Sequence, residues 1–351
     1  MSPSLADRAR RILVIKWGAL GDLVAATTAL RALREAWPSS YITLLANPLM
    51  QQVCPAGTLV DEIIPLGMEQ TGKGKSVRAQ WQLVHRLRKG KYDLAVNLRW
   101  NSERSAVLAW LSGARWRAGS GPTSLAFLYT HRAPLHVGRR HEFHRHCDIL
   151  SPLGIEPKRI VPFVFCAPED LCFTAEFFRE RGLRRETTVG MHPGASKSSK
   201  AWPAKQYGEL ANRLLKRPGV RVLVTWGPGE EALAREIVDH ANGNAVLAPP
   251  TLRVGALASL IGLCGVYVCN YSGPMNVAMG VETPLVALGS TSPEDWGPFG
   301  DIHRTINKSG NKDSYTEEEQ LAMMKQIGVE EVEEMVLRRM RELYGGKTNG
   351  R

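Results

Sequence analysis

Residues 12–22 read Ile-Leu-Val-Ile-Lys-Trp-Gly-Ala-Leu-Gly-Asp, and their order of apolar residues and glycines indicates the architecture of the chain. Its first four residues form a continuous apolar run rich in β-branched side chains, which is typical of a parallel strand buried on both faces. Gly18 and Gly21 then allow a tight turn and a close approach of the backbone to a ligand. From Asp22 to Trp37 apolar residues recur at helical spacing. The stretch therefore predicts a strand, a glycine-rich loop and a helix whose first N–H groups are free to bind an anion.

The same alternation of strand and helix runs through both halves of the chain. The further strands that the pattern predicts are residues 41–46, 60–65, 92–98, 188–191, 220–225, 266–269 and 285–288. The further helices are residues 81–89, 103–111, 175–181, 204–217, 230–241 and 254–263, with a charged helical tail at 316–344. The connection between the halves is marked by Pro152, Pro157, Pro162 and Pro168. We therefore expect an α/β protein with two Rossmann-like, doubly wound parallel sheets, one in residues 1–165 and one in residues 166–351.

Length and composition agree with that expectation. The 351 residues suit two domains, and 44% hydrophobic with 23% charged residues is an ordinary globular balance. No apolar run approaches the ~18–20 residues that cross a bilayer. The basic start, Met1 to Arg11, is followed by only a short apolar run, which is too brief for a signal-peptide core, so we expect a cytoplasmic protein. Six scattered cysteines without a CxxC pair predict free thiols.

The net charge of the chain is strongly positive. At +11 it indicates polyanionic partners, which are nucleotides, phosphorylated lipids or nucleic acid. The basic residues are spread along the chain rather than massed with aromatic residues, and the sequence contains no nucleic-acid-binding motif. We therefore expect no nucleic-acid partner.

The loop that ends at Asp22 has two interpretations. It is neither a GxGxxG dinucleotide fingerprint nor a Walker A loop, because no Gly-Lys-Ser/Thr follows. Asp22 stands where a helix N-cap would stand, and capping alone contributes about 1 kcal/mol. It also stands at the carboxyl edge of a parallel sheet, where ligand chemistry takes place in this architecture. The residues alone leave both interpretations open.

Two later loops have the composition of anion-binding sites. Residues 192–203 read His-Pro-Gly-Ala-Ser-Lys-Ser-Ser-Lys-Ala-Trp-Pro and offer backbone N–H groups with a point charge at Lys197 or Lys200. A solvated loop that merely carries lysines is the alternative. Residues 270–280 open a helix after a short strand and leave a hydroxyl and N–H groups for a phosphate. All three loops follow strands, so we expect them to converge on one ligand cleft.

Taken together and in order, these motifs resemble glycosyltransferase family 9, the ADP-heptose:lipopolysaccharide heptosyltransferases. The resemblance runs from about Ile12 to Gly300. The motifs that carry it are Lys-x-Gly-x-x-Gly-Asp at 16–22, Pro-Gly-Ala…Lys-x-Trp-Pro at 193–203, Gly227 with Glu230 or Glu231, Asn-x-Ser-Gly-Pro-Met at 270–275, and Thr-Ser-Pro…Trp-Gly-Pro-Phe-Gly at 291–300.

The resemblance implies a GT-B glycosyltransferase that is inverting, metal-independent and free of cofactors. Its nucleotide-sugar donor, typically ADP-heptose, would bind mainly the C-terminal domain. A phosphorylated glycolipid or lipopolysaccharide-core acceptor would bind the N-terminal domain, with peripheral contact to the inner face of the inner membrane. Asp22 would be the general base that deprotonates the acceptor hydroxyl. Lys200 would be the second catalytic residue and would offset charge on the departing diphosphate.

The remaining candidate residues come from the same resemblance and from the loops. The donor-binding candidates are Gly18, Gly21, Gly194, Ala195, Ser196, Lys197, Gly227, Glu230, Tyr271, Ser272, Gly273, Pro274, Met275 and Asn276. The acceptor-binding candidates are Arg99, Arg104, Arg117 and His141. His141 and His144 lie one helical turn apart, which would allow a metal site. We prefer a basic helix face near an anionic acceptor, and expect no metal.

Two positions depart from the family pattern. The third loop commonly reads Asn-Asp-Ser-Gly-Pro-Met-His, and here Tyr271 and Asn276 stand in place of the Asp and the His. These neutral side chains predict an active enzyme that prefers a donor other than ADP-heptose. The alternatives are a nucleotide-sugar-binding protein that has lost turnover, and a GT-B relative such as a nucleotide-sugar epimerase. Asp22 favours a transferase over a binding protein, because a binding protein needs no base.

Overall fold

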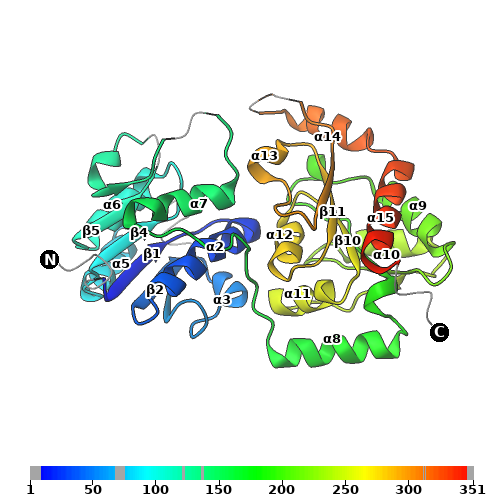
Figure 1. Ribbon diagram of the computed structural model, residues 1–351, viewed down its shortest axis with the longest axis horizontal. Helices are drawn as coiled ribbons and strands as arrows, with labels where there is room; N and C mark the ends of the chain where they lie inside the picture. The colour runs from blue at the N-terminus through cyan, green and yellow to red at the C-terminus, as the bar shows by residue number, and fades with distance from the viewer. Residues whose placement is uncertain are drawn as a thin grey trace. The chain divides into compact units, whose positions relative to one another are not determined.

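The computed structural model describes residues 9–67, 76–120, 123–135, 138–310, 312 and 314–345 (Figure 1). Residues 1–8 of the basic N-terminus considered above lie outside the described residues. The chain divides into two compact units, Met1–Phe163 (unit 1) and Val164–Arg351 (unit 2), so the division falls close to the expected boundary at residue 165. Each unit is built on a six-stranded sheet with helices packed on it, and the predicted α/β class is confirmed.

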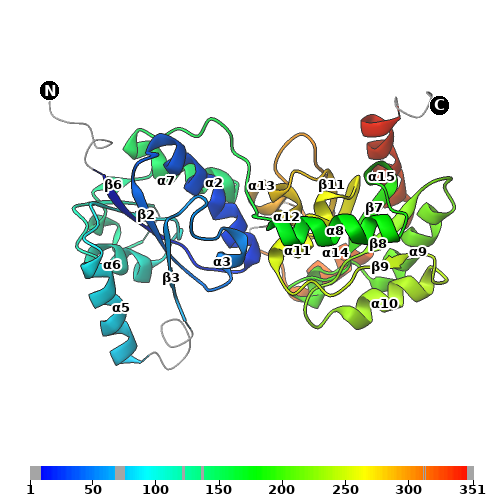
Figure 2. The same ribbon diagram turned by 90° about the horizontal axis from the view of Figure 1, so that it is seen from below.

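Unit 1 contains the first sheet, with the strand order β3-β2-β1-β4-β5-β6 and parallel pairing throughout. Its strands are β1 (Arg11–Ile15), β2 (Tyr41–Ala46), β3 (Glu62–Pro65), β4 (Leu94–Asn97), β5 (Trp116–Gly119) and β6 (His131–Arg132). Its helices are α2 (Leu20–Ala36), α3 (Met50–Val53), α5 (Val77–Lys89), α6 (Glu103–Leu111) and α7 (Glu142–Leu150), with short 3-10 turns η1 (Ala126–Leu128) and η2 (Ser151–Leu153). Figure 2 shows α2 and α7 on one side of this sheet and α5 and α6 on the other.

Unit 2 contains the second sheet, with the order β12-β11-β10-β7-β8-β9, again parallel. Its strands are β7 (Thr188–His192), β8 (Arg221–Val224), β9 (Val246–Leu247), β10 (Val266–Asn270), β11 (Leu285–Gly289) and β12 (Arg304–Asn307). Its helices are α8 (Pro168–Glu180), α9 (Ala204–Leu215), α10 (Glu231–His240), α11 (Val254–Gly262), α12 (Gly273–Gly280), α13 (Pro293–Trp296), α14 (Glu317–Lys325) and α15 (Val329–Tyr344), with turns η3 (Arg185–Thr187) and η4 (Ser198–Lys200).

The two sheets have the same topology. Numbered within its own unit, each follows the order 3-2-1-4-5-6, so the first and fourth strands are neighbours and the chain leaves them toward opposite edges. In doubly wound sheets, ligands bind beyond the carboxyl ends of these two strands. The strands concerned are β1 and β4 in unit 1, and β7 and β10 in unit 2. The three loops singled out in the sequence follow β1, β7 and β10, so each stands where such a fold binds its ligand.

Alternating strand residues supply the core on each face of a sheet. In unit 1, Leu13 and Ile15 of β1 pack with Leu83 and Leu87 of α5. In unit 2, the equivalent residues of β7 pack beneath α9 and α15. Burial of these side chains is the main favourable contribution to the stability of each sheet. Among the described residues, no helix has both the length and the apolar character needed to cross a membrane.

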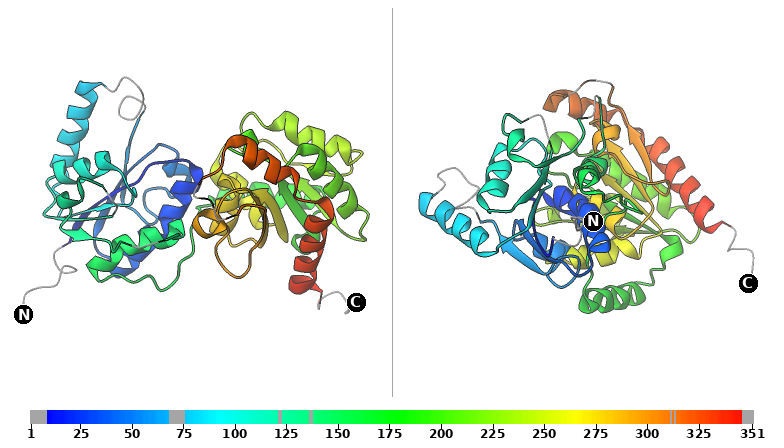
Figure 3. Two further views of the ribbon diagram at one scale, coloured as in Figure 1. Left: turned by 90° about the horizontal axis from the view of Figure 1, so that it is seen from above. Right: turned by 60° about the vertical axis from the view of Figure 1, so that its left-hand side comes forward.

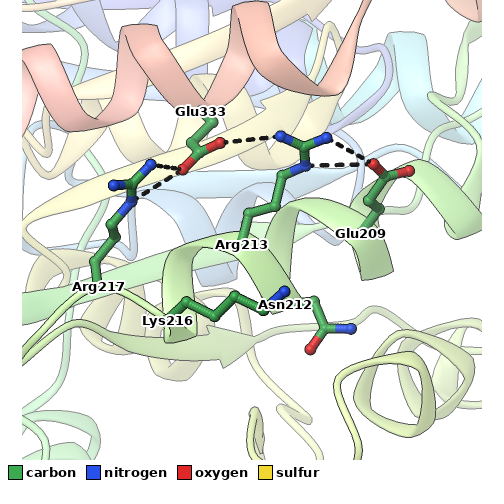
Figure 4. A pocket seen from close by; sticks show the side chains of 6 residues that line it. All are labelled: Glu209, Asn212, Arg213, Lys216, Arg217 and Glu333. Carbon is green, nitrogen blue, oxygen red and sulfur yellow. Dashed lines mark hydrogen bonds and ion pairs between the residues drawn. The ribbon is translucent and has the colours of Figure 1, made fainter.

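Charged side chains fix the C-terminal helix α15 to α9 around an open hollow of about 510 Å³ (Figure 4). Glu333 of α15 lies 2.7 Å from Arg217 and 3.5 Å from Arg213. Arg213 also pairs with Glu209, one turn earlier on α9, at 3.1 Å. The arginines of the hollow are therefore already neutralised by carboxylates, and the network serves to hold α15 in place.

Several elements differ from the prediction, for local reasons. Helix α8 begins at Pro168 rather than at residue 175, because proline is well suited to the first turn of a helix. The predicted helical tail is two helices, and Figure 3 shows α14 and α15 meeting at an angle. The sequence pattern does not predict β5, β6, β9 and β12, of which β6 and β9 have only two residues each, too few for a periodicity.

Candidate active site

Unit 1 places a buried lysine at the end of β1. Lys16 directly follows this strand, and its Nζ lies 3.5 Å from Asp22 Oδ1, 3.2 Å from Glu142 Oε1 and 2.9 Å from His146 Nε2. Glu142 and His146 are one turn apart on α7, and both are buried. A buried ammonium group is tolerated only when it is paired and hydrogen-bonded, and these neighbours meet that need. We refer to these four residues as the Lys16 cluster.

Asp22 is the member of the Lys16 cluster that solvent reaches. Its side chain keeps 26% exposure, against 3% for Lys16. Helix α2 begins at Leu20, so Asp22 is the third residue of the helix and not its N-cap. Its Oδ2 nevertheless accepts a hydrogen bond from the Ala19 N–H at 3.1 Å, while Oδ1 faces Lys16. The carboxylate therefore both caps the helix and stands at the edge of the sheet, so the two interpretations from the sequence are compatible.

Gly18 is required by this carboxylate. A Cβ at position 18 would lie 2.6 Å from the Cβ and carboxylate of Asp22, so a larger residue would push that side chain aside. Asn47 holds the loop from the other side, since its Oδ1 accepts from the Gly18 N–H at 2.9 Å and its Nδ2 donates to the Gly18 carbonyl at 3.1 Å. The glycine thus shapes the loop around Asp22. Donor contacts of Gly18 and Gly21 stay predictions.

The charges in the Lys16 cluster are set by burial and by Lys16. Burial opposes ionisation of Glu142, but His146 and the Lys16 ammonium outweigh it and hold the pKa of Glu142 well below its usual range. Burial, together with the Lys16 charge, lowers the pKa of His146. His146 Nε2 lies between the two charged groups, 2.9 Å from Lys16 Nζ and 3.2 Å from Glu142 Oε1. The Lys16 ammonium is thereby held beside Asp22, which it orients.

Arg99 and Arg104 lie beside the first loop. They follow β4, the neighbour of β1, and their guanidinium carbons lie 5.3 and 5.6 Å from the centre of the Trp17 ring. Arg99 also donates to the Trp17 carbonyl at 2.9 Å, and burial lowers the pKa of Arg104. Guanidinium groups that stack on an aromatic ring are well placed to bind phosphate or carboxylate groups with their remaining donors. The structure therefore brings both candidates for acceptor binding to Trp17, in the loop that ends at Asp22.

The other two acceptor candidates are engaged in local structure. Arg117 donates to the carbonyl oxygens of Leu128 at 2.6 Å and Ala114 at 2.7 Å, and so fixes the chain around β5. His141 is the N-cap of α7, where its Nδ1 accepts from the Phe143 N–H at 3.3 Å. Neither observation adds support to an acceptor contact. Within the described ranges, no three His, Cys, Asp or Glu side chains gather in a way that could hold a metal ion.

In unit 2, the loop after β7 offers one available lysine. Lys197 lies 2.7 Å from Glu317 of α14 and is already paired. Lys200 is partly buried at the end of η4, and across the described part of the chain no carboxylate lies within ion-pair distance of its Nζ. Burial and the nearby charge of Lys197 both lower the pKa of Lys200. An anion placed beside Lys200 would relieve both effects, so Lys200 is the stronger of the two candidates.

Buried Asn270 holds the second and third loops together. Its Nδ2 donates to the carbonyl oxygens of Pro193 at 2.8 Å and Gly194 at 3.2 Å, and its Oδ1 accepts from the Trp202 N–H at 3.0 Å. Asn270 ends β10, so one side chain sets the position of the loop after the neighbouring strand β7. This contact fixes the backbone around Gly194 and Ala195, the predicted phosphate-binding segment.

Glu230 stands against the same loop. Its carboxylate lies 3.1 Å from His192 Nε2 and accepts from the Gly227 N–H at 2.8 Å. A Cβ on Gly194 would lie 2.1 Å from the Glu230 carboxylate, which shows how closely the two approach. Burial alone would raise the pKa of Glu230, but His192 and the Gly227 N–H outweigh it and lower that pKa. The group is therefore an ionised, half-exposed acceptor, which suits sugar hydroxyls.

The third loop opens α12 with backbone N–H groups that have no partner within the helix itself. Ser272 precedes the helix, Gly273 and Pro274 are its first residues, and the N–H groups of a first turn have no partner within the helix. Met275 is buried and offers its N–H rather than its side chain. The Asn276 amide donates to the Ser272 carbonyl at 3.3 Å.

The side chain of Tyr271 is directed into the sheet. It is buried, and its hydroxyl lies 2.6 Å from Thr305 Oγ1 on β12. A Cβ on Gly289 would lie 2.7 Å from the tyrosine ring, so the ring crosses β11 to reach β12. The sequence predicts a donor contact for Tyr271, whereas in the structure its hydroxyl contacts Thr305 of β12, the strand beyond β11.

The sequence pattern does not single out Glu142, His146 and Asn270 as residues that build the site. Lys16 belongs to the first motif, but nothing in that motif tells which groups surround it. The four-residue spacing of Glu142 and His146 was available as a signal, since it places both on one face of a helix. That face of α7 contacts Lys16, at the end of β1, only when the unit is folded. The sequence alone therefore does not reveal the contact.

Comparison with known families places most of the chain in one of them. Residues 80–326 match the model of glycosyltransferase family 9 (heptosyltransferase). Lipopolysaccharide heptosyltransferase 2 of Escherichia coli K12 is 28% identical over 320 residues, which cover 84% of this chain and 87% of that protein.

Solved structures agree with the family match at the level of the fold. The crystal structure of the glycosyl transferase family 9 protein from Veillonella parvula DSM 2008 superposes with a TM-score of 0.79 at 24% identity, covering 97% of this chain and 99% of that one. The E. coli ADP-heptose lps heptosyltransferase II gives a TM-score of 0.73 at 22% identity over 95% and 99% of the two chains.

Proposed function

The chain belongs to glycosyltransferase family 9 (heptosyltransferase) and has its GT-B fold, and from that premise we propose that it transfers a heptose or a related sugar from an ADP-linked donor to a phosphorylated lipopolysaccharide-core or other anionic glycan acceptor. Unit 2 binds the nucleotide-sugar and unit 1 binds the acceptor. The observation that carries the proposal is the partly exposed carboxylate of Asp22, held by Lys16 at the point where a doubly wound sheet binds its ligand.

Asp22 acts as the general base of an inverting transfer. Its carboxylate takes the proton of the acceptor hydroxyl while that oxygen forms a bond to the anomeric carbon of the donor. The bond from that carbon to the diphosphate oxygen breaks, and the nucleoside diphosphate leaves with the electron pair. Lys16 and the Ala19 N–H orient the carboxylate through its two oxygens. Arg99 and Arg104 bind the anionic group of the acceptor.

Unit 2 supplies the positive field for the leaving group without a metal ion. Lys200 pairs with the diphosphate, together with backbone N–H groups near Gly194 and at the start of α12. Glu230 accepts hydrogen bonds from the ribose hydroxyls. We expect transfer to continue in the presence of EDTA, and no cofactor to be needed.

The alternative from the sequence, a binding protein without turnover, has less support. The Lys16 cluster buries two charged groups, which costs desolvation free energy, and a protein that only bound nucleotide in unit 2 would have no use for it. Family membership likewise favours a glycosyltransferase over an epimerase.

A donor panel tests the proposal. The purified chain is incubated with ADP-heptose and with other ADP-, UDP-, GDP- and CDP-sugars, with and without EDTA, and with a heptose-accepting core oligosaccharide. Transfer from an ADP-sugar to the acceptor, resistant to EDTA, is the expected result. Nucleotide binding without transfer to any acceptor would refute the proposal in favour of a binding protein.

A further inference from the structure

The net positive charge of the chain lies in unit 1. Residues 1–163 contain 23 Lys and Arg against 11 Asp and Glu, whereas residues 164–351 contain 22 against 23. Unit 1 therefore carries a net charge of +12 and unit 2 a net charge of −1. A unit with so large an excess is attracted to anionic surfaces over the range of the Debye length.

Helix α5 concentrates this charge on one element. Its sequence, Val-Arg-Ala-Gln-Trp-Gln-Leu-Val-His-Arg-Leu-Arg-Lys, has four Lys or Arg residues and no Asp or Glu. Arg86 is paired with Glu62 at 3.2 Å, and Arg88 donates to the Leu111 carbonyl. Arg78 and Lys89 have no carboxylate within ion-pair distance in the described part of unit 1. Both charges are therefore open to an external anion.

The same helix exposes large apolar side chains next to these charges. Ala79, Leu83 and Leu87 form the stripe that packs on the core. Val77 and Trp81, one turn apart on another row, are 72% and 71% exposed. Figure 2 shows α5 on the face of the unit 1 sheet that it shares with α6, and α6 is the labelled helix beside it. Because Trp81 is exposed, it does not contribute to the core of unit 1. It lies on a helix that has basic but no acidic residues.

We propose that the exposed face of α5, formed by Val77, Arg78, Trp81 and Lys89, docks unit 1 on an anionic lipid bilayer. Tryptophan favours the interface between acyl chains and headgroups, where its ring is buried and its N–H stays hydrogen-bonded. Lys and Arg beside it bind lipid phosphates, each contributing to attraction toward an anionic leaflet. The proposal rests on the proposed function in one respect, because a lipid-linked acceptor would lie in that same bilayer.

A bilayer fits this face better than a second copy of the chain. The face presents unpaired positive charges and no acidic residue on the helix, so two copies of it would repel each other. Its two exposed apolar residues form a short row, far less apolar surface than a stable dimer buries. A bilayer needs no matching pocket, and shallow insertion of one tryptophan with adjacent cations is a recognised way to bind it.

Vesicle flotation of the full chain tests the docking face. The probes are phosphatidylethanolamine vesicles with about one quarter phosphatidylglycerol, and phosphatidylcholine vesicles as the neutral comparison. We expect binding to the anionic vesicles alone, weakened roughly tenfold by Trp81→Ser and at least as much by Arg78→Glu with Lys89→Glu. Matched controls in unit 2 are Leu252→Ser, at an 89% exposed leucine, and Lys216→Glu with Lys325→Glu, which should bind as the parent does.

Two results would overturn the docking proposal. One is equal binding to both kinds of vesicle, or binding that neither set of α5 variants changes. The other is vesicle-free self-association that depends on Trp81, which would make a second copy the occupant. Thermal melts check that the surface variants fold as the parent does.

A transfer assay separates docking from the proposed function. Trp81→Ser should slow transfer to an acceptor embedded in vesicles but leave transfer to a delipidated acceptor unchanged. Absence of transfer to either acceptor in the parent would refute the proposed function, while flotation would still decide the docking face.

Discussion

At the level of single residues, Asp22 is held between two partners that leave part of its carboxylate exposed. Lys16 faces one oxygen and the Ala19 N–H binds the other. Asp22→Asn keeps the shape and can still accept from Ala19, but it removes the basic group. We expect turnover to fall by about 10²-fold or more, the usual scale for loss of a general base, with nucleotide affinity and melting temperature close to those of the parent. Steady-state kinetics beside calorimetry measure this, and comparable turnover would leave Asp22 as a helix cap.

The two lysines of the second loop form a matched pair for a test. Lys200 lacks a carboxylate partner in the described ranges, whereas Lys197 is paired with Glu317. Lys200→Ala should weaken nucleoside diphosphate binding by roughly 1.5–3 kcal/mol, the range for a hydrogen bond to a charged group. Lys197→Ala should change it far less, because that charge is exposed and already neutralised. Calorimetry with ADP compares them, and the reverse order would assign the phosphate contact to Lys197.

At the level of elements, the Lys16 cluster joins α7 to β1 and makes unit 1 sensitive to acid. The pKa of Glu142 and that of His146 are both lowered in the folded chain, so the unfolded chain binds more protons at low pH. Stability from these groups is present at neutral pH. It is lost as the pH falls below 6.5 for His146 and below 4.5 for Glu142, the ordinary values of the two side chains.

Glu142→Gln tests this linkage. The variant cannot lose a proton at position 142, so its unfolding free energy should fall less steeply than that of the parent below pH 4.5. Urea unfolding across a pH series measures the slope, and Glu35→Gln at an exposed position is the control. Parallel slopes in parent and Glu142→Gln would mean that Glu142 is not held ionised by Lys16.

The helices and strands show which parts of the structure can be predicted from the sequence. Strand β1 and helix α2 are predictable because one apolar run and one helical periodicity encode them locally. The surroundings of Lys16 are not predictable in this way, since Glu142 and His146 of α7 follow it by 126 and 130 residues and reach it only in the folded unit. Tyr271 is a similar case. Its place in the third loop predicts a donor contact, while the missing side chain of Gly289 lets its ring reach Thr305.

That placement of Tyr271 gives a prediction about α12 and the sheet beneath it. Thr305 donates to the Ala287 carbonyl at 3.2 Å, so its oxygen is free to accept from the Tyr271 hydroxyl. Tyr271→Phe should lower the unfolding free energy by about 1 kcal/mol and leave the ranking of donors unchanged. Denaturant unfolding and the donor panel measure the two effects. A changed ranking would mean that the hydroxyl contacts the donor; otherwise a donor preference caused by the third loop rests on Asn276.

At the level of the whole molecule, the two units share one topology but differ in net charge. Both place their loops beyond the first and fourth strands, but unit 1 carries +12 and unit 2 carries −1. A shared fold therefore does not set the kind of ligand that each unit attracts. Under the proposed function, the unit with the long-range positive field takes the phosphorylated acceptor, and the neutral unit binds its diphosphate through short-range contacts at Lys200 and backbone N–H groups.

This division predicts different salt dependences for the two substrates. Raising the salt from roughly 0.05 to 0.5 M shortens the Debye length from above 10 Å to about 4 Å, which screens the field of unit 1 but not a contact at a partly buried lysine. The KM for a phosphorylated soluble acceptor should therefore rise several-fold at saturating donor, while the Kd for ADP changes by less. A dephosphorylated acceptor is the matched control, and its KM should be nearly constant. A KM for the phosphorylated acceptor that is as constant in salt as that of the dephosphorylated one would show that the charge of unit 1 has no part in acceptor binding.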